Sequence, residues 1–383
     1  WESRARFEVG EAGRLSVPER APAEGTYEGA DAMGPFWSMR SLDAGPSGPL
    51  DPEALFVPGE SGYDVDLAAE VDGETVAEAT TTRRLFDPEI ERRSVDHPDL
   101  VGRFFAPPGD GSAPGVLHLH GAGGRPHLAT GRLLASRGYA ALVLHYFGDP
   151  GPLPDGLVEV PVEYVETAVE WLRERDRVIG RVGLVGFSRG GTLALLAGSR
   201  CADVGAVVGW VPGGVVWEGL TARRRPAGTS AWSVDGEPVP YLSMAEPELG
   251  PPPNPGLPYF GPALSAASED ERRAASVPVE ETDAPVLLVS ATDDARWPST
   301  RLSERVVERL DASDYPHEYR HDRYEGAGHY LRLPYLPTPG TVRDRYRVYG
   351  GAPAANARAS ARAWTGTLSF LGRALGGPPT PTA

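Results

Sequence analysis

The sequence contains no lysine, one cysteine and no long apolar run, and each absence excludes a class of protein. All 37 basic residues are arginine. Because Cys201 has no partner in the chain, an internal disulfide framework and most cysteine-based metal sites are excluded. No stretch approaches the roughly 20 uninterrupted apolar residues of a membrane span, and the first residues lack the basic head and apolar core of a secretory signal. We therefore expect a cytoplasmic protein without a membrane span.

The formal net charge is −16, which argues against a nucleic-acid-binding protein because such proteins need a basic surface to contact phosphates. An acidic surface without lysine is typical of proteins adapted to high salt, since carboxylates keep the surface hydrated. A GC-rich genome would also replace lysine by arginine, but it does not explain the acidic excess. We therefore favour a halophilic protein.

Two kinds of sequence pattern divide the 383 residues at about residue 88. Residues 1–88 contain short β-prone runs, such as 63–71 and 80–86, separated by turns rich in Gly and Pro. Short strands between such turns are typical of a small β-sandwich. We expect an N-terminal immunoglobulin-like sandwich over 1–88 and a second domain over 89–383.

In residues 89–383 apolar strands alternate with amphipathic helices. Continuously apolar strands are buried on both faces, which predicts an α/β domain with a mostly parallel central sheet. The expected strands begin near Gly115, Ala140, Val182, Val204, Pro285 and His317, and the expected helices cover 162–172, 299–310 and 354–375.

Residues 213–283 interrupt this alternation with a stretch rich in Pro and Gly. A loop of this length within a compact domain is usually either functional or disordered. Because it lies between two core strands, we interpret it as a lid or a substrate-pocket insertion, with a disordered excursion as the alternative.

The strongest functional motif is G-x-S-x-G at Gly186, Ser188 and Gly190, directly after an apolar strand and directly before a helical run. A nucleophile elbow needs such a strained turn, and small neighbours let the backbone segments pass closely. The motif predicts that Ser188 is a nucleophile in an α/β-hydrolase domain.

A serine hydroxyl needs a base, and in this fold the order along the chain is serine, acid, histidine. His329 lies in a glycine-rich loop after the last expected strand and is the predicted base. The acid should follow the strand that begins at Pro285, where Asp293 and Asp294 are adjacent. We favour Asp294 because it lies further into the loop, and we expect the other aspartate to form a turn or cap a helix.

The expected oxyanion hole combines two backbone N–H groups. One belongs to Arg189, at the start of the helix after the nucleophile, and the other to Ala122, with Gly121 as an alternative. His118 and His120 lie two residues apart on one strand face, but without a third ligand nearby a metal site is not expected. We interpret both histidines as packing or loop support.

The chain resembles the family of acyl-CoA thioester hydrolases and bile acid-CoA:amino acid N-acyltransferases. The resemblance covers nearly the whole length and rests on segments including Met33-Gly-Pro-Phe-Trp-Ser-Met, 114–124, 163–172, 293–299 and Tyr349-Gly-Gly-Ala-Pro. It implies a two-domain enzyme that forms an acyl-enzyme, with nucleophile, acid and base at Ser188, Asp294 and His329. The acyltransferases of the family carry cysteine at the elbow, so serine implies hydrolysis by water. One departure is His120, where relatives carry an apolar residue.

These features favour a serine acyl-CoA thioesterase that needs no cofactor and acts on a small-molecule acyl-CoA or ester. A carboxylesterase or lactone hydrolase without CoA recognition is the main alternative. An N-acyltransferase is less favoured, and a non-enzymatic scaffold would require a broken triad. Within the insertion, the arginines at 223–225 are interpreted either as contacts for CoA phosphates or as a solvated basic turn. Nothing in the sequence indicates the oligomeric state.

Overall fold

The computed structural model describes the chain except residues 10–12, 43–54, 60–61, 149–152, 332 and 378–383. An eight-stranded sheet forms its centre, with the strand order β17-β16-β11-β10-β7-β8-β6-β5. Strands β7, β8, β10, β11, β16 and β17 run parallel to one another, and β6 and β5 pair antiparallel at one edge. The predicted α/β class with a mostly parallel sheet is confirmed. The strands are β5 (Glu91–Ser94), β6 (Val101–Ala106), β7 (Ala113–Leu119), β8 (Ala140–His145), β10 (Val178–Phe187), β11 (Val204–Trp210), β16 (Val286–Ala291) and β17 (Tyr319–Tyr324).

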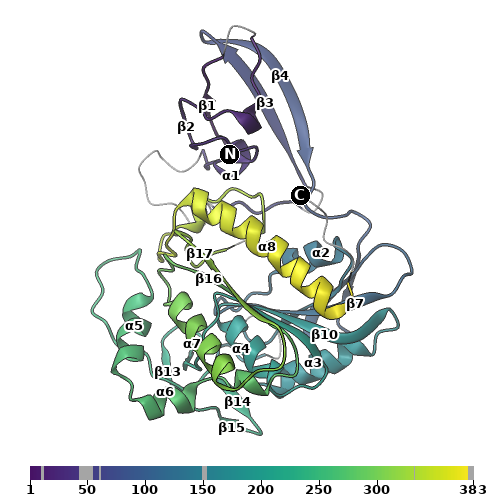
Figure 1. The fold of residues 1–383 in the computed structure, drawn as a ribbon, viewed down its shortest axis with the longest axis vertical. Helices are drawn as coiled ribbons and strands as arrows, with labels where there is room; N and C mark the ends of the chain where they lie inside the picture. The colour runs from purple at the N-terminus through teal and green to yellow at the C-terminus, as the bar shows by residue number, and fades with distance from the viewer. Residues whose placement is uncertain (10–12, 43–54, 60–61, 149–152, 332, 378–383) are drawn as a thin grey trace.

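Five helices cover the two faces of this sheet. Helices α3 (Glu163–Arg173), α4 (Arg189–Gly198) and α7 (Ser299–Ala312) share one apolar core with the sheet, and α2 (Leu128–Ala135) and α8 (Pro353–Leu375) share the other. In Figure 1, α8 crosses above the strands and α3, α4 and α7 lie below them. Strands β7, β8, β11 and β16 are buried along their whole length, which explains why they are largely apolar. Three helices, α3, α7 and α8, occupy the ranges predicted from the sequence, whereas α2 was not predicted.

Residues 213–283, between β11 and β16, fold into short elements around a small core of their own. This core contains Val215, Trp217, Leu242, Leu264 and Ala275 and packs on Trp297 and Leu302. The elements here are β12 (Glu218–Leu220), β13 (Pro226–Ser230), β14 (Trp232–Val234), β15 (Glu237–Pro238), α5 (Leu257–Ala266), α6 (Glu269–Ala275) and the 3-10 helix η3 (Val279–Glu281), with β14 pairing to β9 (Val160–Pro161). The structure therefore has short elements and a small apolar core in this segment, and its role as a lid or pocket insertion stays a prediction.

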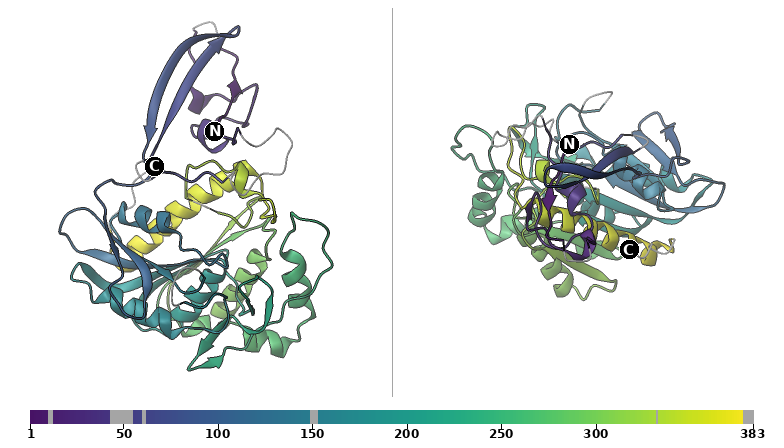
Figure 2. Two further views of the ribbon diagram at one scale, coloured as in Figure 1. Left: turned by 180° about the vertical axis from the view of Figure 1, so that it is seen from behind. Right: turned by 90° about the horizontal axis from the view of Figure 1, so that it is seen from above.

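The N-terminal part forms two separate antiparallel pairs, β1 (Ala5–Arg6) with β2 (Glu24–Gly25) and β3 (Tyr63–Val71) with β4 (Glu74–Arg83). Figure 2 shows the long β3–β4 hairpin projecting away from the central sheet. The 3-10 helix η1 (Val17–Glu19) and the short helix α1 (Gly34–Trp37) also belong to this part, and η4 (Pro339–Thr341) precedes α8. Because residues 43–54 lie outside the described part, the two-sheet sandwich over 1–88 stays a prediction.

The N-terminal part contacts the central domain through α8. Tyr27, Trp37 and Ala357 form one apolar cluster, and the N–H of Thr338 donates to the carbonyl of Trp37 at 2.9 Å. Within the described residues, no helix combines the length and the apolar character needed to cross a membrane.

Candidate active site

Ser188 occupies a strained turn between β10 and α4. Its φ is 57° and its ψ is −121°, a backbone conformation that serine rarely adopts. The turn is possible because two glycines let backbone segments meet closely: a Cβ at Gly186 would lie 2.0 Å from the Gly190 carbonyl oxygen, and a Cβ at Gly190 would lie 2.3 Å from that of His120. The strand-turn-helix context predicted from G-x-S-x-G is present, and it places the hydroxyl at the carboxyl edge of the sheet.

Three side chains from separate loops meet at this turn. The Ser188 hydroxyl lies 2.9 Å from Nε2 of His329, and Nδ1 of His329 lies 2.8 Å from Oδ2 of Asp294. All three are buried, with exposures of 7%, 6% and 4% respectively. An imidazole that donates from Nδ1 to a carboxylate presents an unprotonated Nε2, which accepts the serine proton. The arrangement can therefore activate Ser188 for attack on a carbonyl carbon.

The two adjacent aspartates have different environments. The carboxylate of Asp294 is held by the N–H groups of Arg296 and Trp297, which donate to Oδ1 at 2.8 and 3.2 Å, so Oδ2 is left for the histidine. Asp293 is exposed, and its backbone N–H donates to the carbonyl of Ala327 at 2.9 Å. The structure thus brings Asp294, and not Asp293, to the imidazole.

The loops that carry Asp294 and His329 are held together by residues 342–351. The N–H of His329 donates to the Tyr349 carbonyl at 2.9 Å, and Gly350 pairs with Asp294 in an isolated bridge. Gly350 has a φ of +87°, and a Cβ there would lie 2.0 Å from the carbonyl of Asp293. Tyr349-Gly-Gly belongs to the segments that carry the family resemblance, but the sequence alone assigns it no role. Its glycine pair, which permits this close backbone approach, was the available signal.

The expected oxyanion loop packs directly against the nucleophile. A Cβ at Gly121 would lie 3.2 Å from the Cβ of Ser188. Among the described residues, the N–H of Ala122 makes no hydrogen bond, and the N–H of Arg189 is the first of α4 and has no acceptor within the helix. Both predicted donors are therefore available for an oxyanion.

Every carbonyl of residues 120–124 in this loop is bound by a neighbouring group. The Tyr146 hydroxyl donates to the carbonyl of His120, and His120 Nδ1 donates to that of Gly121 at 2.9 Å. Arg224 donates to the carbonyls of Ala122 and Gly123, the latter at 2.8 Å. His145 Nε2 donates to the carbonyl of Gly124 at 3.2 Å. Burial lowers the pKa of His120 to about 3, which keeps its ring neutral. These contacts fix the direction of the loop's peptide groups. The N–H groups therefore need little reorientation when negative charge develops on the substrate oxygen in the transition state.

The contacts assign roles to two residues that the sequence left open. His120 supports the loop, and the described residues contain no group of three His, Cys, Asp or Glu side chains that could hold a metal. Arg224 is exposed, and its guanidinium donates to the carbonyls of Ala122 and Gly123. Arg223 and Arg225 are exposed and do not line the pocket.

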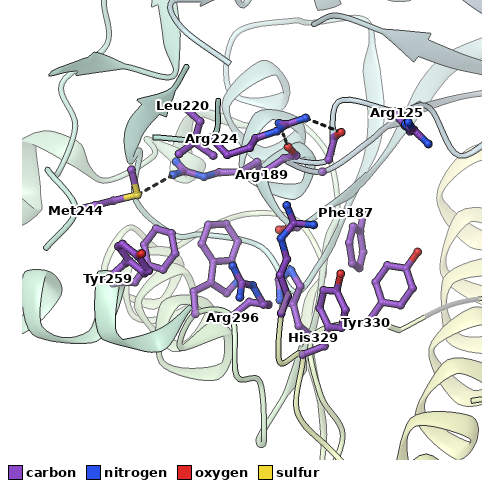
Figure 3. Close-up of a pocket in the computed structure, with 18 of the residues that line it drawn as sticks. Arg125, Phe187, Arg189, Leu220, Arg224, Met244, Tyr259, Arg296, His329 and Tyr330 are labelled. Carbon is purple, nitrogen blue, oxygen red and sulfur yellow. Dashed lines mark hydrogen bonds between the residues drawn. The ribbon is translucent and has the colours of Figure 1, made fainter. Parts of the chain in front are cut away.

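A cavity of about 530 Å³ opens over Ser188 and His329 (Figure 3). Met244, Tyr259 and Phe260 from the insertion line part of it, next to the guanidinium of Arg189. Among the described residues, no carboxylate lines the cavity, whereas five arginines do: Arg125, Arg189, Arg224, Arg296 and Arg347. Residues of 213–283 thus form part of the cavity wall, and the lid role expected for this stretch stays a prediction.

The arginines make the cavity electropositive within an acidic protein. Burial lowers the pKa of Arg224, and the nearby positive charges of Arg347 and Arg125 lower it further. Burial likewise lowers the pKa of Arg296, again with a contribution from Arg347. Like charges placed this close repel one another, so an anionic ligand is favoured here.

The parallel sheet, the elbow and the Ser-His-Asp arrangement define an α/β-hydrolase. Residues 160–377 match the family model described as BAAT / Acyl-CoA thioester hydrolase C terminal, and residues 1–97 match the Acyl-CoA thioester hydrolase/BAAT N-terminal region. The chain belongs to this family, as the resemblance in its sequence implied.

The chain is similar to characterised relatives over nearly its full length. It is 28% identical to acyl-coenzyme A thioesterase 2, mitochondrial, of Mus musculus, covering 97% of this chain and 80% of the relative. It is also 28% identical to acyl-coenzyme A thioesterase 1 of Homo sapiens, covering 98% and 87%. A solved dienelactone hydrolase-like promiscuous phosphotriesterase from metagenomic libraries has a TM-score of 0.47 at 16% identity, covering 75% of this chain and 99% of that chain.

Proposed function

We propose that this protein hydrolyses acyl-CoA thioesters to a free carboxylic acid and CoA through an acyl-enzyme on Ser188. The observation that carries the proposal is the hydrogen-bonded chain from Ser188 to His329 to Asp294 at the floor of an arginine-lined cavity. CoA carries several phosphates, and arginine binds phosphate through paired hydrogen bonds. The thioesterase activity of the family's relatives supports the same substrate class.

The reaction follows from the geometry in two stages. Oγ of Ser188 attacks the thioester carbonyl while Nε2 of His329 accepts its proton, and the N–H groups of Ala122 and Arg189 stabilise the oxyanion. Collapse of this intermediate releases CoA, whose sulfur receives the proton from His329. Water then attacks the acyl-enzyme, with His329 again as the base, and the acid leaves. Asp294 holds the imidazole in the required tautomer throughout.

Hydrolysis fits this chain better than transfer of the acyl group to an amine. The elbow carries serine, and the one cysteine, Cys201, follows the far end of α4 and does not line the cavity. Burial raises the pKa of the Cys201 thiol, which makes it a poorer nucleophile.

Steady-state hydrolysis of an acyl-CoA panel beside p-nitrophenyl esters tests this proposal. We expect acyl-CoAs to be the better substrates and Ser188→Ala to lose about 10⁴ to 10⁶ in rate. Ser199→Ala, at the other end of α4, is the matched control and should retain activity. Rapid turnover of simple esters without turnover of acyl-CoAs would move the enzyme to the carboxylesterase class. Full activity of Ser188→Ala would refute the nucleophile.

As part of the same proposal we place the enzyme in the cytoplasm. The support is compositional, since a chain with one cysteine gains nothing from an oxidising compartment. Immunodetection after cell fractionation tests this location, and recovery of the protein from an exported fraction would contradict it.

A further inference from the structure

One hairpin of the insertion contacts both residues that supply the expected oxyanion hole. This hairpin consists of β12, the turn that follows it and β13, residues 218–230. From the turn, Arg224 donates to the carbonyl of Ala122 (Figure 3). At the start of the hairpin, the backbone carbonyl of Glu218 accepts a hydrogen bond from Nη2 of Arg189 at 3.1 Å. One short segment of the insertion is therefore bonded to both donor residues.

The side chain of Arg189 is buried between the nucleophile turn and this hairpin. The residue is 2% exposed, and in addition to the bond to Glu218 its Nη2 lies 3.9 Å from the sulfur of Met244. The guanidinium Cζ lies 5.6 Å from the ring centre of Phe260 and 5.7 Å from that of Trp297. Packing and a hydrogen bond thus hold the far end of this side chain in place.

Glu218 also supplies a buried carboxylate that compensates this cation. The residue is 6% exposed, and its carboxylate accepts the N–H groups of Gly228 at 2.7 Å and Met244 at 3.1 Å. Burial lowers the pKa of Arg189 to about 9, and the charge of Glu218 opposes this shift. The carboxylate therefore fixes the hairpin, and with it the carbonyl that Arg189 reaches, and it offsets the charge of the guanidinium.

The peptide group between Ser188 and Arg189 is the one whose direction matters for the reaction. Its N–H is the expected oxyanion donor, and the ψ of −121° at Ser188 sets where that N–H points. A backbone conformation this rare persists only where the surrounding structure holds it. Because the buried side chain of Arg189 has little freedom, rotation of this peptide group would disturb its contact with Glu218.

We propose that Glu218 is a positioning residue for the hydrolytic reaction: through the side chain of Arg189 it keeps the backbone N–H of Arg189 directed at the oxyanion. This inference rests on the proposed function, in which that N–H is a donor. Since Arg224 holds the loop of Ala122, the hairpin 218–230 positions both halves of the oxyanion hole. The insertion therefore contributes to the rate of the chemical step as well as to the cavity wall.

Glu218→Gln tests this role, because glutamine has the same shape but lacks the charge and one acceptor. We expect kcat to fall about tenfold on acyl-CoAs and p-nitrophenyl esters alike, with KM within about twofold, because outright loss of a donor costs about 100-fold or more and here the donor is only misdirected. Glu159→Gln is the matched control, since its half-buried carboxylate accepts the Thr229 hydroxyl of the same hairpin and, among the described contacts, does not bond to Arg189. That control should keep wild-type kcat. An equal loss in both variants, or none in Glu218→Gln, would overturn the inference.

A transition-state analogue separates a misdirected donor from a general loss of folded enzyme. Oγ of Ser188 adds to the carbonyl carbon of an alkyl trifluoromethyl ketone, the serine proton passes to His329, and the carbonyl oxygen becomes an oxyanion. The corresponding alcohol cannot react in this way. We expect Glu218→Gln to weaken inhibition by the ketone about tenfold, in step with kcat, and to leave inhibition by the alcohol unchanged. Equal weakening of both would assign Glu218 to the shape of the cavity and would contradict the inference.

Arg189→Met is the second variant, and it keeps the backbone N–H. The Glu218 carboxylate retains its two backbone donors in this variant, so it stays hydrogen-bonded. Arg189→Met should lose about as much kcat as Glu218→Gln, and the double variant no more than either single one, because both act through one contact. Independent, multiplying losses would show that the inference is wrong. If Glu218→Gln does not fold, the ratio of ketone to alcohol inhibition in Arg189→Met decides.

The same measurements distinguish this inference from the proposed function. If the wild type hydrolyses esters but no acyl-CoA, the thioesterase function fails, and the ester and ketone data still decide the role of Glu218. If the wild type hydrolyses neither kind of substrate, both proposals are wrong.

Discussion

Replacing Asp294 with asparagine should abolish most activity while the fold persists. In the wild type the N–H groups of Arg296 and Trp297 donate to Oδ1 of Asp294. Asparagine has the same shape, and its amide oxygen can accept the same two hydrogen bonds. The amide NH₂ would then face Nδ1 of His329, which lies 2.8 Å from Oδ2. Two donors cannot share that position, so the imidazole would move its proton to Nε2. In that tautomer it cannot accept the proton of Ser188.

The expected loss follows from this change of tautomer. In a serine protease the same substitution lowers kcat by about 10⁴, and each factor of ten corresponds to about 1.4 kcal/mol of barrier. We expect a similar loss here, about 5 kcal/mol in the transition state. The free energy of unfolding should change by about 1 kcal/mol or less, because the backbone hydrogen bonds are kept.

The assay follows the release of the CoA thiol under saturating acyl-CoA, with urea unfolding of the same preparations. Asp293→Asn is the control, since this neighbouring carboxylate is exposed, and it should retain wild-type kcat. An Asp294→Asn enzyme within tenfold of wild type would refute the reasoning. So would an equal loss in Asp293→Asn.

Three further predictions concern the loop and the surface. Arg224→Met should lower kcat about tenfold even on p-nitrophenyl esters, which carry no CoA, because the carbonyls of Ala122 and Gly123 lose their donor. The control Arg223→Met should have no effect on kcat. A loss of activity confined to acyl-CoAs would assign Arg224 to phosphate binding instead. His120 is neutral when folded and regains its ordinary pKa of 6.5 on unfolding, so acidification favours the unfolded chain. Between about pH 7 and about pH 5 this linkage removes about 2 kcal/mol of stability. His120→Asn keeps a donor but does not titrate, so its urea midpoint should vary less with pH, and an unchanged pH dependence would contradict this account. Finally, the net charge of −16 predicts that molar KCl raises the melting temperature, whereas full activity and an unchanged melting temperature in dilute buffer would count against salt adaptation.

The sheet was predictable because its strands are buried on both faces and therefore read as continuous apolar runs. Strands β5 and β6 were not predicted from apolar runs, and they pair antiparallel at the edge of the sheet. The run Glu91–Ser94 is polar, and its burial pattern is that of an exposed edge strand. Helix α2 was missed because its eight residues are too few to show a clear helical period.

At the site, local motifs pointed to Ser188 and His329 as candidates because each lies in a glycine-rich turn, and the structure brings the two side chains together. The preference for Asp294 over Asp293 rested on loop position alone, and only the path of the backbone shows which side chain turns inward. The support by Arg224 and the exposure of Arg189 to the cavity depend on how 213–283 folds back over the sheet. That stretch has no periodicity from which its contacts could be derived.

The arrangement of the insertion bears on how such enzymes diversify. Ser188, Asp294 and His329 sit on loops after β10, β16 and β17, whereas several apolar side chains of the cavity wall come from 213–283. The three side chains of the triad and much of the apolar lining of the cavity therefore belong to different stretches of the chain, although Arg224 of the insertion also binds the oxyanion loop. We expect mutations of the apolar lining within 213–283, away from Arg224, to change which acyl groups are accepted while the triad keeps its geometry. For the same reason, exchanging this segment between family members is a direct route to enzymes with new acyl preferences.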